Sequence, residues 1–421
     1  MCIRDRSIVD TYFVATSAVR DAKNGHEFIE SLEKKFNIKI HVISGKEEGL
    51  LAASGVLLGW PKATGIVCDI GGSSLEIAYL ENGKIKTAQS FELGPLALQD
   101  YHVLGKSKLE VIKLKLSKIN KSFPNKINSL FLVGGCWRGL AKIHMNLTNY
   151  PLKVLQGYKV PVKNFDPTLE FISNTKNTEL LQITSSSEER VKLLPDACIV
   201  LKAIYEKFCP RELFFSGYGI REGIIFCKFN NEIKKLDPLL QACLYLEKNR
   251  SRYSGFGKIL FEWLLPIFPK IDNKRKKIFL AACYLHDTFW QAHPDYRSEV
   301  CFETVTGANL GGIDHSGRIF LALSLMSRYK KTDLNKIDKK YLLLLNKKKI
   351  KQAIILGACM RLGAMLSVNI LENLRKTKIY TKEKTLYLEM MEKDNLLGDS
   401  VEKRFNHLGN LMNLKSKINL V

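Results

Sequence analysis

Three segments of the sequence place acidic, basic, hydroxyl and glycine residues where apolar runs end. In the most distinctive one, Val67–Glu76, an apolar strand carries Asp69 near its end, the chain turns, and Glu76 follows on the returning strand. The turn consists of Gly71, Gly72, Ser73 and Ser74. Glycines let backbone N–H groups approach a phosphate, and serine hydroxyls add donors. Because acids flank the turn on both strands and can hold a divalent cation, we favour a phosphate site over a purely structural hairpin.

Two further strand ends carry charged residues whose role depends on context. In Ile43–Gly49, two adjacent acids, Glu47 and Glu48, fall in the first turn of an expected helix. Acids there complement the helix dipole, which is the favoured interpretation from the residues alone. The alternative is that one of them accepts a proton from a water that attacks phosphorus. In Val14–Ala22, Arg20 suits bidentate phosphate binding, although a single arginine after a strand is more often a surface charge.

Alternating strand and helix patterns predict the elements that position these segments. Before residue 64 we expect strands at Tyr12–Ala15 and Ile38–Ile43 and helices at Gly25–Phe36 and Lys46–Leu58, with Ser44 as a cap. Such alternation implies an α/β layer with a largely parallel sheet, in which ligands bind at the carboxyl ends of the strands. Further along we expect strands at Gly65–Ile70, Leu75–Leu80, Lys84–Phe91, Leu130–Val133 and Glu212–Ser216, and helices over 109–119 and at Pro195–Phe208.

The hydrophobic pattern changes near residue 230: strand-like patterns become rare and helical spacing of apolar residues dominates. We therefore predict a first α/β domain over residues 1–63, a second over 64–229 and an all-helical domain over 230–421. Uninterrupted apolar runs fall far below the roughly 18 residues that cross a bilayer, so we expect a soluble protein that does not enter a membrane. The ten cysteines show no CxxC spacing, which favours buried free thiols in a reducing cytoplasm.

The 421 residues include 65 Lys and Arg against 42 Asp and Glu, a formal net charge of +23. Such an excess attracts polyanions, and composition alone does not choose among nucleic acid, a membrane surface and a phosphate-rich small substrate. No aromatic-rich basic motif or known reader element is visible, which disfavours nucleic acid.

Five ordered segments resemble the exopolyphosphatase / guanosine pentaphosphate phosphatase family. They are ATSAVRDA, ISGKEEG, VCDIGGSSLEIAYLENGKI, VGGCWRGLA and FFSGYGIREG, which together span about Val14 to Gly223. The resemblance implies a two-domain α/β core like that of actin, Hsp70 and sugar kinases (ribonuclease H-like), followed by a helical, HD-like C-terminal domain. It implies a cytoplasmic enzyme, expected as a homodimer, that hydrolyses the terminal phosphoanhydride of inorganic polyphosphate and releases orthophosphate.

The resemblance also assigns roles to single residues. Glu48 matches the catalytic base, Arg20 matches an arginine that contacts phosphate, and Asp69 and Glu76 match acids that organise Mg²⁺, or Mn²⁺ in its place. Gly71, Gly72, Ser73 and Ser74 match a phosphate-binding loop, with Ser73 where a third glycine is common. The family's first phosphate loop, an Asp-Leu-Gly-Ser-Asn-Ser type of segment, has no counterpart before Thr11. We therefore expect a chain truncated at its N-terminus, with residues 1–6 foreign to the domain.

Other interpretations stay open from the sequence. The substrate can instead be guanosine pentaphosphate, which also presents a terminal phosphoanhydride, or the chain can be a non-catalytic polyanion binder because the first phosphate loop is missing. The pair His286-Asp287 invites comparison with metal-dependent HD phosphohydrolases. No histidine lies between His144 and His286 to supply the upstream ligand, so we favour a structural role for the pair.

Overall fold

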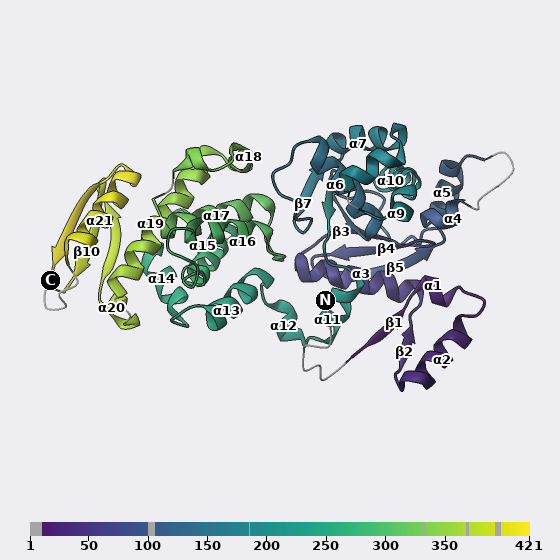
Figure 1. The fold of residues 1–421 in the computed structure, drawn as a ribbon, viewed down its shortest axis with the longest axis horizontal. Coiled ribbons are helices and arrows are strands. Elements are labelled where there is room, and N and C mark those ends of the chain that lie inside the picture. Colours follow the sequence, from purple (N-terminus) through teal and green to yellow (C-terminus); the bar gives the residue numbers. More distant parts are fainter. Residues whose placement is uncertain (1–10, 100–105, 185, 332, 368–369, 392–396) are drawn as a thin grey trace. The chain divides into compact units, whose positions relative to one another are not determined.

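The chain forms two compact units in the computed structural model (Figure 1). The structure describes residues 11–99, 106–184, 186–331, 333–367, 370–391 and 397–421. Unit 1 extends to Asn149 and continues from Leu155 to Lys235, and unit 2 comprises Tyr150–Val154 and Leu236–Val421. The two α/β segments expected before and after residue 64 both lie in unit 1. The expected loss of a first phosphate loop concerns residues before Thr11, which lie outside the described residues.

Unit 1 is built on a six-stranded mixed sheet in the order β5-β4-β3-β6-β8-β7. Its strands are β3 (Gly65–Ile70), β4 (Leu75–Glu81), β5 (Lys84–Phe91), β6 (Ser129–Val133), β7 (Tyr158–Pro161) and β8 (Glu212–Phe215). Strands β3, β6 and β8 are parallel, whereas β4, β5 and β7 pair antiparallel with their neighbours. The expectation of a largely parallel sheet was drawn from the segment before residue 64, where β1 and β2 are parallel. In the six-stranded sheet, tight turns connect β3, β4 and β5 directly, so these strands are antiparallel.

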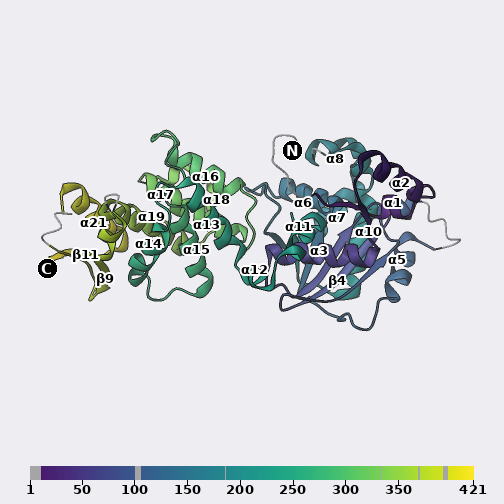
Figure 2. The same ribbon diagram turned by 90° about the horizontal axis from the view of Figure 1, so that it is seen from below.

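Helices cover both faces of this sheet. Helices α3 (Gly45–Gly59) and α11 (Ile220–Lys228) pack together on one face, and α6 (Gly135–Leu147), α7 (Val162–Asn174) and α10 (Leu194–Phe208) lie on the other (Figures 1 and 2). The remaining helices are α4 (Pro95–Gln99), α5 (Lys108–Ser117), α8 (Asn177–Thr184), α9 (Glu188–Lys192) and α12 (Asn231–Lys235). The buried face of α3 packs on β3, β4 and β5, so the sheet fixes the position of this helix.

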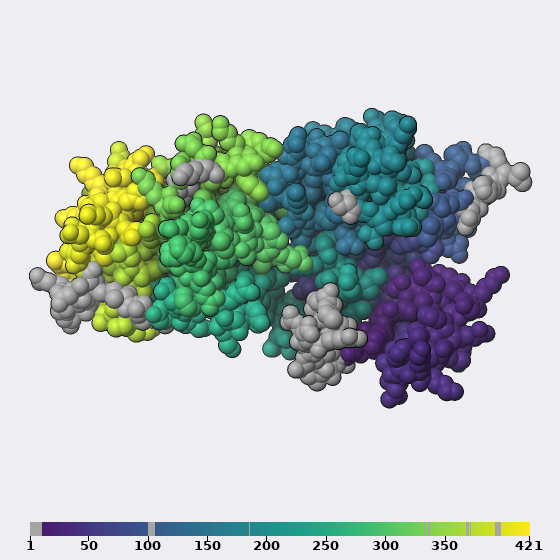
Figure 3. Space-filling model, viewed as in Figure 1, coloured from purple at the N-terminus to yellow at the C-terminus, as the bar shows by residue number. Residues whose placement is uncertain are grey.

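A small lobe of unit 1 precedes the main sheet and is drawn in purple in Figure 3. It contains the parallel strands β1 (Phe13–Ala15) and β2 (Ile40–Val42) and the helices α1 (Ser17–Arg20) and α2 (Gly25–Phe36). The helix expected at Gly25–Phe36 is confirmed, and both strands are shorter than expected. Because the strands are parallel, the segments that follow them, with Arg20 and Glu48, leave the sheet at the same edge.

Unit 2 is mainly helical around one large apolar core. Its helices are α13 (Pro238–Arg250), α14 (Phe256–Leu264), η1 (Leu265–Ile267), α15 (Asn273–Leu285), α16 (Arg297–Gly307), α17 (His315–Tyr329), η2 (Leu334–Lys336), α18 (Lys339–Leu342), α19 (Lys347–Ser367), α20 (Leu371–Arg375) and α21 (Asp399–Met412). Of the described helices, α19 is long and apolar enough to cross a bilayer by length and composition, but 56% of its apolar window is buried in the protein. Core helices of soluble proteins pass the same test.

The prediction of an all-helical C-terminal domain is wrong in its last part. Strands β9 (Lys378–Lys382), β10 (Thr385–Met390) and β11 (Lys415–Leu420) form a sheet in the order β11-β10-β9. Glu383 and Lys384 make the turn between β9 and β10 with φ of 48° and 57°. Hairpin turns of this kind normally use Asn or Gly, so the sequence carried no turn signal even though both strands alternate apolar and polar residues.

The cysteines follow their prediction in part. The nine cysteines described are free thiols, seven of them buried, whereas Cys209 and Cys227 are exposed.

Candidate active site

The two adjacent acids at the start of α3 have different environments. Glu47 closes a capping box: its Oε2 accepts from the backbone N–H of Ser44 at 2.7 Å, and its own N–H donates to Ser44 Oγ at 3.3 Å. Its side chain stays at the surface. Glu48, one position on, points about 100° further round the helix and is only 5% exposed. The dipole role favoured from the residues alone therefore suits Glu47, while Glu48 faces the interior of unit 1.

Arg20 lies beside Glu48. Its Nη1 donates to Glu48 Oε2 at 3.3 Å and to the backbone oxygen of Ile43 at 2.8 Å. Burial raises the pKa of Glu48 above its usual value, and Arg20 opposes that shift only in part. A carboxylate whose pKa is raised towards neutrality is a stronger base than a solvated one.

Asp69 and Glu76 face each other across the central hairpin. They are directly opposite in the register of the antiparallel pair β3–β4, so both side chains lie on one face of the sheet. Asp69 is 8% exposed and Glu76 is 1% exposed. Glu76 Oε1 accepts from Ser90 Oγ at 2.8 Å, whereas its buried Oε2 has no hydrogen-bond partner in the described part of the chain. A Cβ on Gly49 would lie 3.3 Å from Glu76 Cβ, so this glycine lets α3 approach the pair closely.

The three carboxylates influence one another electrostatically. Burial, followed by the charge of Glu48, raises the pKa of Asp69 to about 7 and that of Glu76 to about 8. At Asp69 the positive charge of Arg138 opposes the shift. At Glu76 the hydroxyls of Ser90 and Ser74 oppose it. Clustered buried carboxylates of this kind are characteristic of catalytic and cation-binding sites.

The glycine-serine turn between β3 and β4 is held on both sides. Within it, the Gly71 N–H donates to the Ser74 carbonyl at 2.9 Å. From the following segment, the backbone N–H groups of Leu96 and Gly94 donate to the carbonyls of Gly72 and Ser73 at 2.8 and 3.0 Å. Carbonyl groups of the turn are therefore occupied by protein. Because these hydrogen bonds already order the turn, a ligand would bind it without a further loss of backbone conformational entropy.

A cavity of about 410 Å³ opens at the carboxyl ends of the parallel strands of unit 1. Asp69 contributes to its wall from β3, Gly134 and Arg138 follow β6, and residues 216–222 follow β8. The other predicted site residues, Arg20, Glu48, Gly71, Gly72, Ser73, Ser74 and Glu76, do not line this cavity. Asp69 is thus the predicted residue that connects the carboxylate group to the open space.

Arg138 was not predicted from the sequence, although its segment was singled out. Its Nε donates to the carbonyl of Gly134 at 3.3 Å, and its charge acts on Asp69. Gly134 has φ of +115°, and a Cβ there would lie 2.9 Å from Asp69 Oδ1. The available signal was the same as for Arg20, an arginine in the first helical turn after a strand.

The carboxylates suit a divalent cation by their chemistry. The described residues contain no group of three or more His, Cys, Asp or Glu side chains close enough to hold a metal by themselves. Mg²⁺ does not require one, because it is usually bound by one or two carboxylates, by waters and by phosphate oxygens of the substrate. Asp69, which reaches the cavity, and Glu76, with its unpartnered Oε2, fit this mode.

His286 and Asp287 in unit 2 have protein partners. Arg252 donates to Asp287 through Nη2 at 2.6 Å and Nε at 2.9 Å. His286 Nδ1 contacts the carbonyl of Cys283 at 2.8 Å. Both residues are buried. The ion pair of Asp287 and the hydrogen bond of His286 suit a structural role.

Comparisons with known proteins add relatives at low identity. The guanosine-5'-triphosphate,3'-diphosphate pyrophosphatase of Aeromonas salmonicida is 24% identical over 287 residues, which cover 65% of this chain and 57% of that protein. A putative exopolyphosphatase of Haemophilus influenzae is 25% identical over 226 residues, covering 51% and 67%. A solved exopolyphosphatase from Cytophaga hutchinsonii is 22% identical with a TM-score of 0.48, covering 53% and 76%. The chain thus spans somewhat more than half the length of the Aeromonas relative.

Two family models match the chain one after the other. The model described as exopolyphosphatase, C-terminal, matches residues 239–420. The model described as Ppx/GppA phosphatase family matches residues 5–232, more than half of the chain. The resemblance seen in the sequence is therefore confirmed, and the chain belongs to the Ppx/GppA phosphatase family.

Proposed function

We propose that this protein is a phosphoanhydride hydrolase that removes the terminal phosphate of inorganic polyphosphate. The observation that carries the proposal is the group of Glu48, Asp69 and Glu76, three buried carboxylates with Arg20 paired to the first. Membership of the Ppx/GppA phosphatase family and a relative named as a putative exopolyphosphatase support the choice of reaction. We also infer that the α/β core is of the actin, Hsp70 and sugar kinase type.

In the proposed mechanism each residue has one task. Glu48 accepts a proton from the attacking water, because its carboxylate is buried and has a raised pKa. Arg20, already hydrogen-bonded to Glu48, places positive charge where the transferring phosphoryl group develops negative charge. Asp69 and Glu76 would hold Mg²⁺, which when bound neutralises charge on the phosphate oxygens. The glycine-serine turn positions the phosphate chain.

The decisive test compares two neighbouring glutamates. Glu48→Gln removes the base and is expected to lower kcat for orthophosphate release by about 10²–10⁴-fold. Glu47→Gln is the matched control, because glutamine preserves a capping box and the side chain is exposed. Both variants are expected to bind polyphosphate like the parent. Equal turnover in parent and Glu48→Gln would remove Glu48 from the proposed role.

A second candidate substrate is guanosine pentaphosphate, favoured by the Aeromonas relative named for a guanosine nucleotide. The cavity has two tyrosines in its wall, Tyr12 and Tyr218, and its 410 Å³ falls within the range of small-molecule sites. Orthophosphate release from long-chain polyphosphate and from the nucleotide, measured on one preparation, distinguishes the two substrates. The comparisons give no support to the non-catalytic alternative. The homodimer and the cytoplasmic location stay predictions.

A further inference from the structure

Four helices and one connecting segment of unit 2 bring five arginines into one region. Arg297 begins α16, Arg328 lies in the last turn of α17, Arg361 lies within α19 and Arg404 within α21. Helix α17 packs against α16 and α19, and α19 packs against α21. The fifth residue, Arg252, follows α13. We refer to these five residues as the arginine cluster.

Ring contacts and electrostatic interactions relate Arg252, Arg297 and Arg328 to one another. Two guanidinium groups contact the ring of Tyr329: the Cζ atoms of Arg297 and Arg328 lie 5.6 and 5.0 Å from the ring centroid. Arg252 pairs with Asp287, and the charges of Arg252, Arg297 and Asp287 all act on Arg328. Arg328 is therefore close to two other arginines and to one carboxylate, that of Asp287.

The arginines of the cluster outnumber the acidic side chains that pair with them. Among the described residues, Arg252 forms an ion pair, whereas Arg297, Arg328, Arg361 and Arg404 form none. Arg297 donates to backbone carbonyls. The Nε atoms of Arg328 and Arg404 are buried without a hydrogen-bond partner. Buried donors without acceptors cost free energy. An acceptor from outside the described chain would therefore stabilise the arginine cluster.

The shifts in pKa agree with this excess. Burial, together with the charges of Arg404 and Arg328, lowers the pKa of Arg361 to about 10. The pKa of His407 on α21 is lowered by burial and by Lys331, Arg361 and Arg404. The partly negative C-terminus of α17 offsets charge at Arg328 only, because a helix dipole acts within its last turn. Among the described residues, no ion pair offsets the charges of Arg361 and Arg404, which act on each other.

We propose that the arginine cluster binds a compact anion with two neighbouring phosphate groups, at a site separate from the carboxylate group of unit 1. Guanidinium groups bind phosphate oxygens bidentately and keep their charge at all physiological pH values. Arg297, Arg328, Arg361 and Arg404 are half-buried, which suits a small anion held among helices better than an extended nucleic acid on an open surface. This proposal does not depend on the reaction proposed for unit 1.

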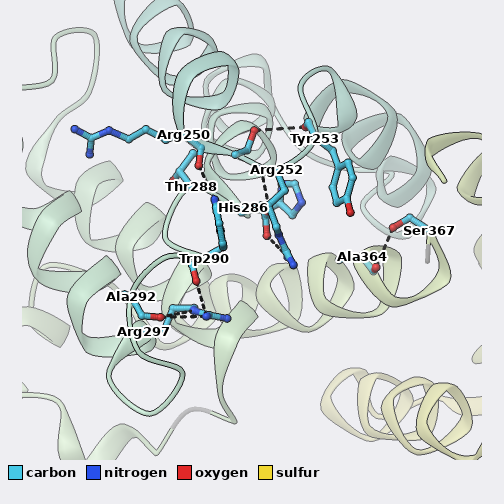
Figure 4. Close-up of polar contacts among 12 residues, drawn as sticks. Arg250, Arg252, Tyr253, His286, Thr288, Trp290, Ala292, Arg297, Ala364 and Ser367 are labelled. Carbon is cyan, nitrogen blue, oxygen red and sulfur yellow. Dashed lines mark hydrogen bonds and ion pairs between the residues drawn. The ribbon is translucent and has the colours of Figure 1, made fainter. Parts of the chain in front are cut away.

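Binding of inorganic pyrophosphate to the full chain, measured by calorimetry without divalent cations, tests the proposal. The double variant Arg361→Gln/Arg404→Gln is expected to raise Kd at least about 10-fold, equivalent to about 1.4 kcal/mol. Arg250→Gln is the matched control, because Arg250 is exposed and points away from Arg252 and Arg297 (Figure 4). Arg20→Gln, which alters unit 1, is expected to leave one pyrophosphate bound. An unchanged Kd in the double variant, or a loss of binding in Arg20→Gln alone, overturns the proposal.

Thermal unfolding gives a second readout that covers failure to fold. Pyrophosphate is expected to raise the Tm of the parent by mass action, and to raise that of the double variant by less. Without anion at low salt, the double variant is expected to melt no lower than the parent, because two like charges are gone. If the double variant does not fold, Arg361→Gln alone serves the same comparison. A parent whose Tm responds to pyrophosphate no more than to chloride at equal ionic strength contradicts the site.

Orthophosphate and long-chain polyphosphate distinguish the sources of the phosphate groups. We expect pyrophosphate to bind more tightly than orthophosphate, since it contacts more guanidinium groups at once. Binding of long-chain polyphosphate that depends on Arg361 and Arg404, without binding of pyrophosphate, would overturn the compact-anion proposal and indicate an extended track instead.

Discussion

Asp69 and Glu76 lie directly opposite one another in the β3–β4 pair, and both carboxyl groups are almost completely buried. Neither forms an ion pair within the described residues, and the nearby charge of Glu48 disfavours ionisation of both. A pair of carboxylates in this position costs folding free energy unless a cation or a proton compensates the charge. Binding of a cation to the pair would therefore remove this unfavourable contribution to the free energy of folding.

The first prediction follows from this cost. Glu76→Gln keeps the shape of the side chain and removes the charge that Glu76 carries above its pKa of about 8. At a pH above that value, with divalent cations chelated, the variant is expected to raise Tm by roughly 2–4 °C for each 1 kcal/mol relieved. Glu92→Gln, at an exposed position of the same unit, is expected to change stability by less than about 0.5 kcal/mol. A Tm of Glu76→Gln below that of the parent would contradict the repulsion argument.

The same two proteins test the proposed cation. Mg²⁺ is expected to raise the Tm of the parent, because a ligand that binds the native state stabilises it, and to have a smaller effect on Glu76→Gln. Sodium chloride at matched ionic strength controls for screening. An equal response of parent and variant to Mg²⁺ would place the cation away from Glu76.

The sequence predicted the local elements around the site better than the relations between them. The strands β3 and β5 and the helix α2 were predicted with their observed bounds, because turn residues and apolar periodicity mark them. The buried position of Glu48 and the exposed position of Glu47 depend on the rotation of α3 on its sheet, which local sequence does not encode. Arg138 was missed because its relation to Asp69 arises only when β6 pairs beside β3.

The second prediction concerns pH and unit 2. Burial lowers the pKa of His286 to about 4, with the charge of Arg328 adding to the shift and that of Asp287 opposing it. The folded state therefore keeps His286 neutral while the unfolded chain binds a proton near pH 6.5. Stability from this group is complete above about pH 6.5 and is lost as pH falls towards 4.

His286→Phe tests this dependence by removing the titrating ring. Unfolding of the parent, followed by thermal melts between pH 7 and 4.5, is expected to show a decline in Tm that is shallower in the variant. His293→Asn, at an exposed histidine of the same unit, is expected to follow the parent. Parallel curves for parent and His286→Phe would exclude His286 as the source of the decline.

The third prediction concerns the close approach at Gly134. Gly134→Ala places a Cβ about 2.7 Å from the carbonyl oxygen of Ile70, at φ of +115°. Strained backbone of this kind costs of order 1–3 kcal/mol, so urea unfolding is expected to show a loss in that range. Gly307→Ala is the control, because a Cβ there meets nothing within 4 Å. A fully stable Gly134→Ala protein would show that the segment after β6 relaxes freely.

The fourth prediction tests Arg138, whose guanidinium borders the cavity beside Asp69. A charged hydrogen bond to phosphate contributes about 1.5–3 kcal/mol, so Arg138→Gln is expected to lower kcat/KM for phosphate release by roughly 10- to 100-fold. Arg138→Lys keeps the charge but not the bidentate donor geometry, so its kcat/KM is expected to lie between those of the parent and Arg138→Gln. The exposed Arg211→Gln is the control in the same unit. If Arg138→Gln and Arg211→Gln both retained the kcat/KM of the parent, Arg138 would not contact the reacting phosphate. The substrate would then have to reach Asp69 from the side of the glycine-serine turn.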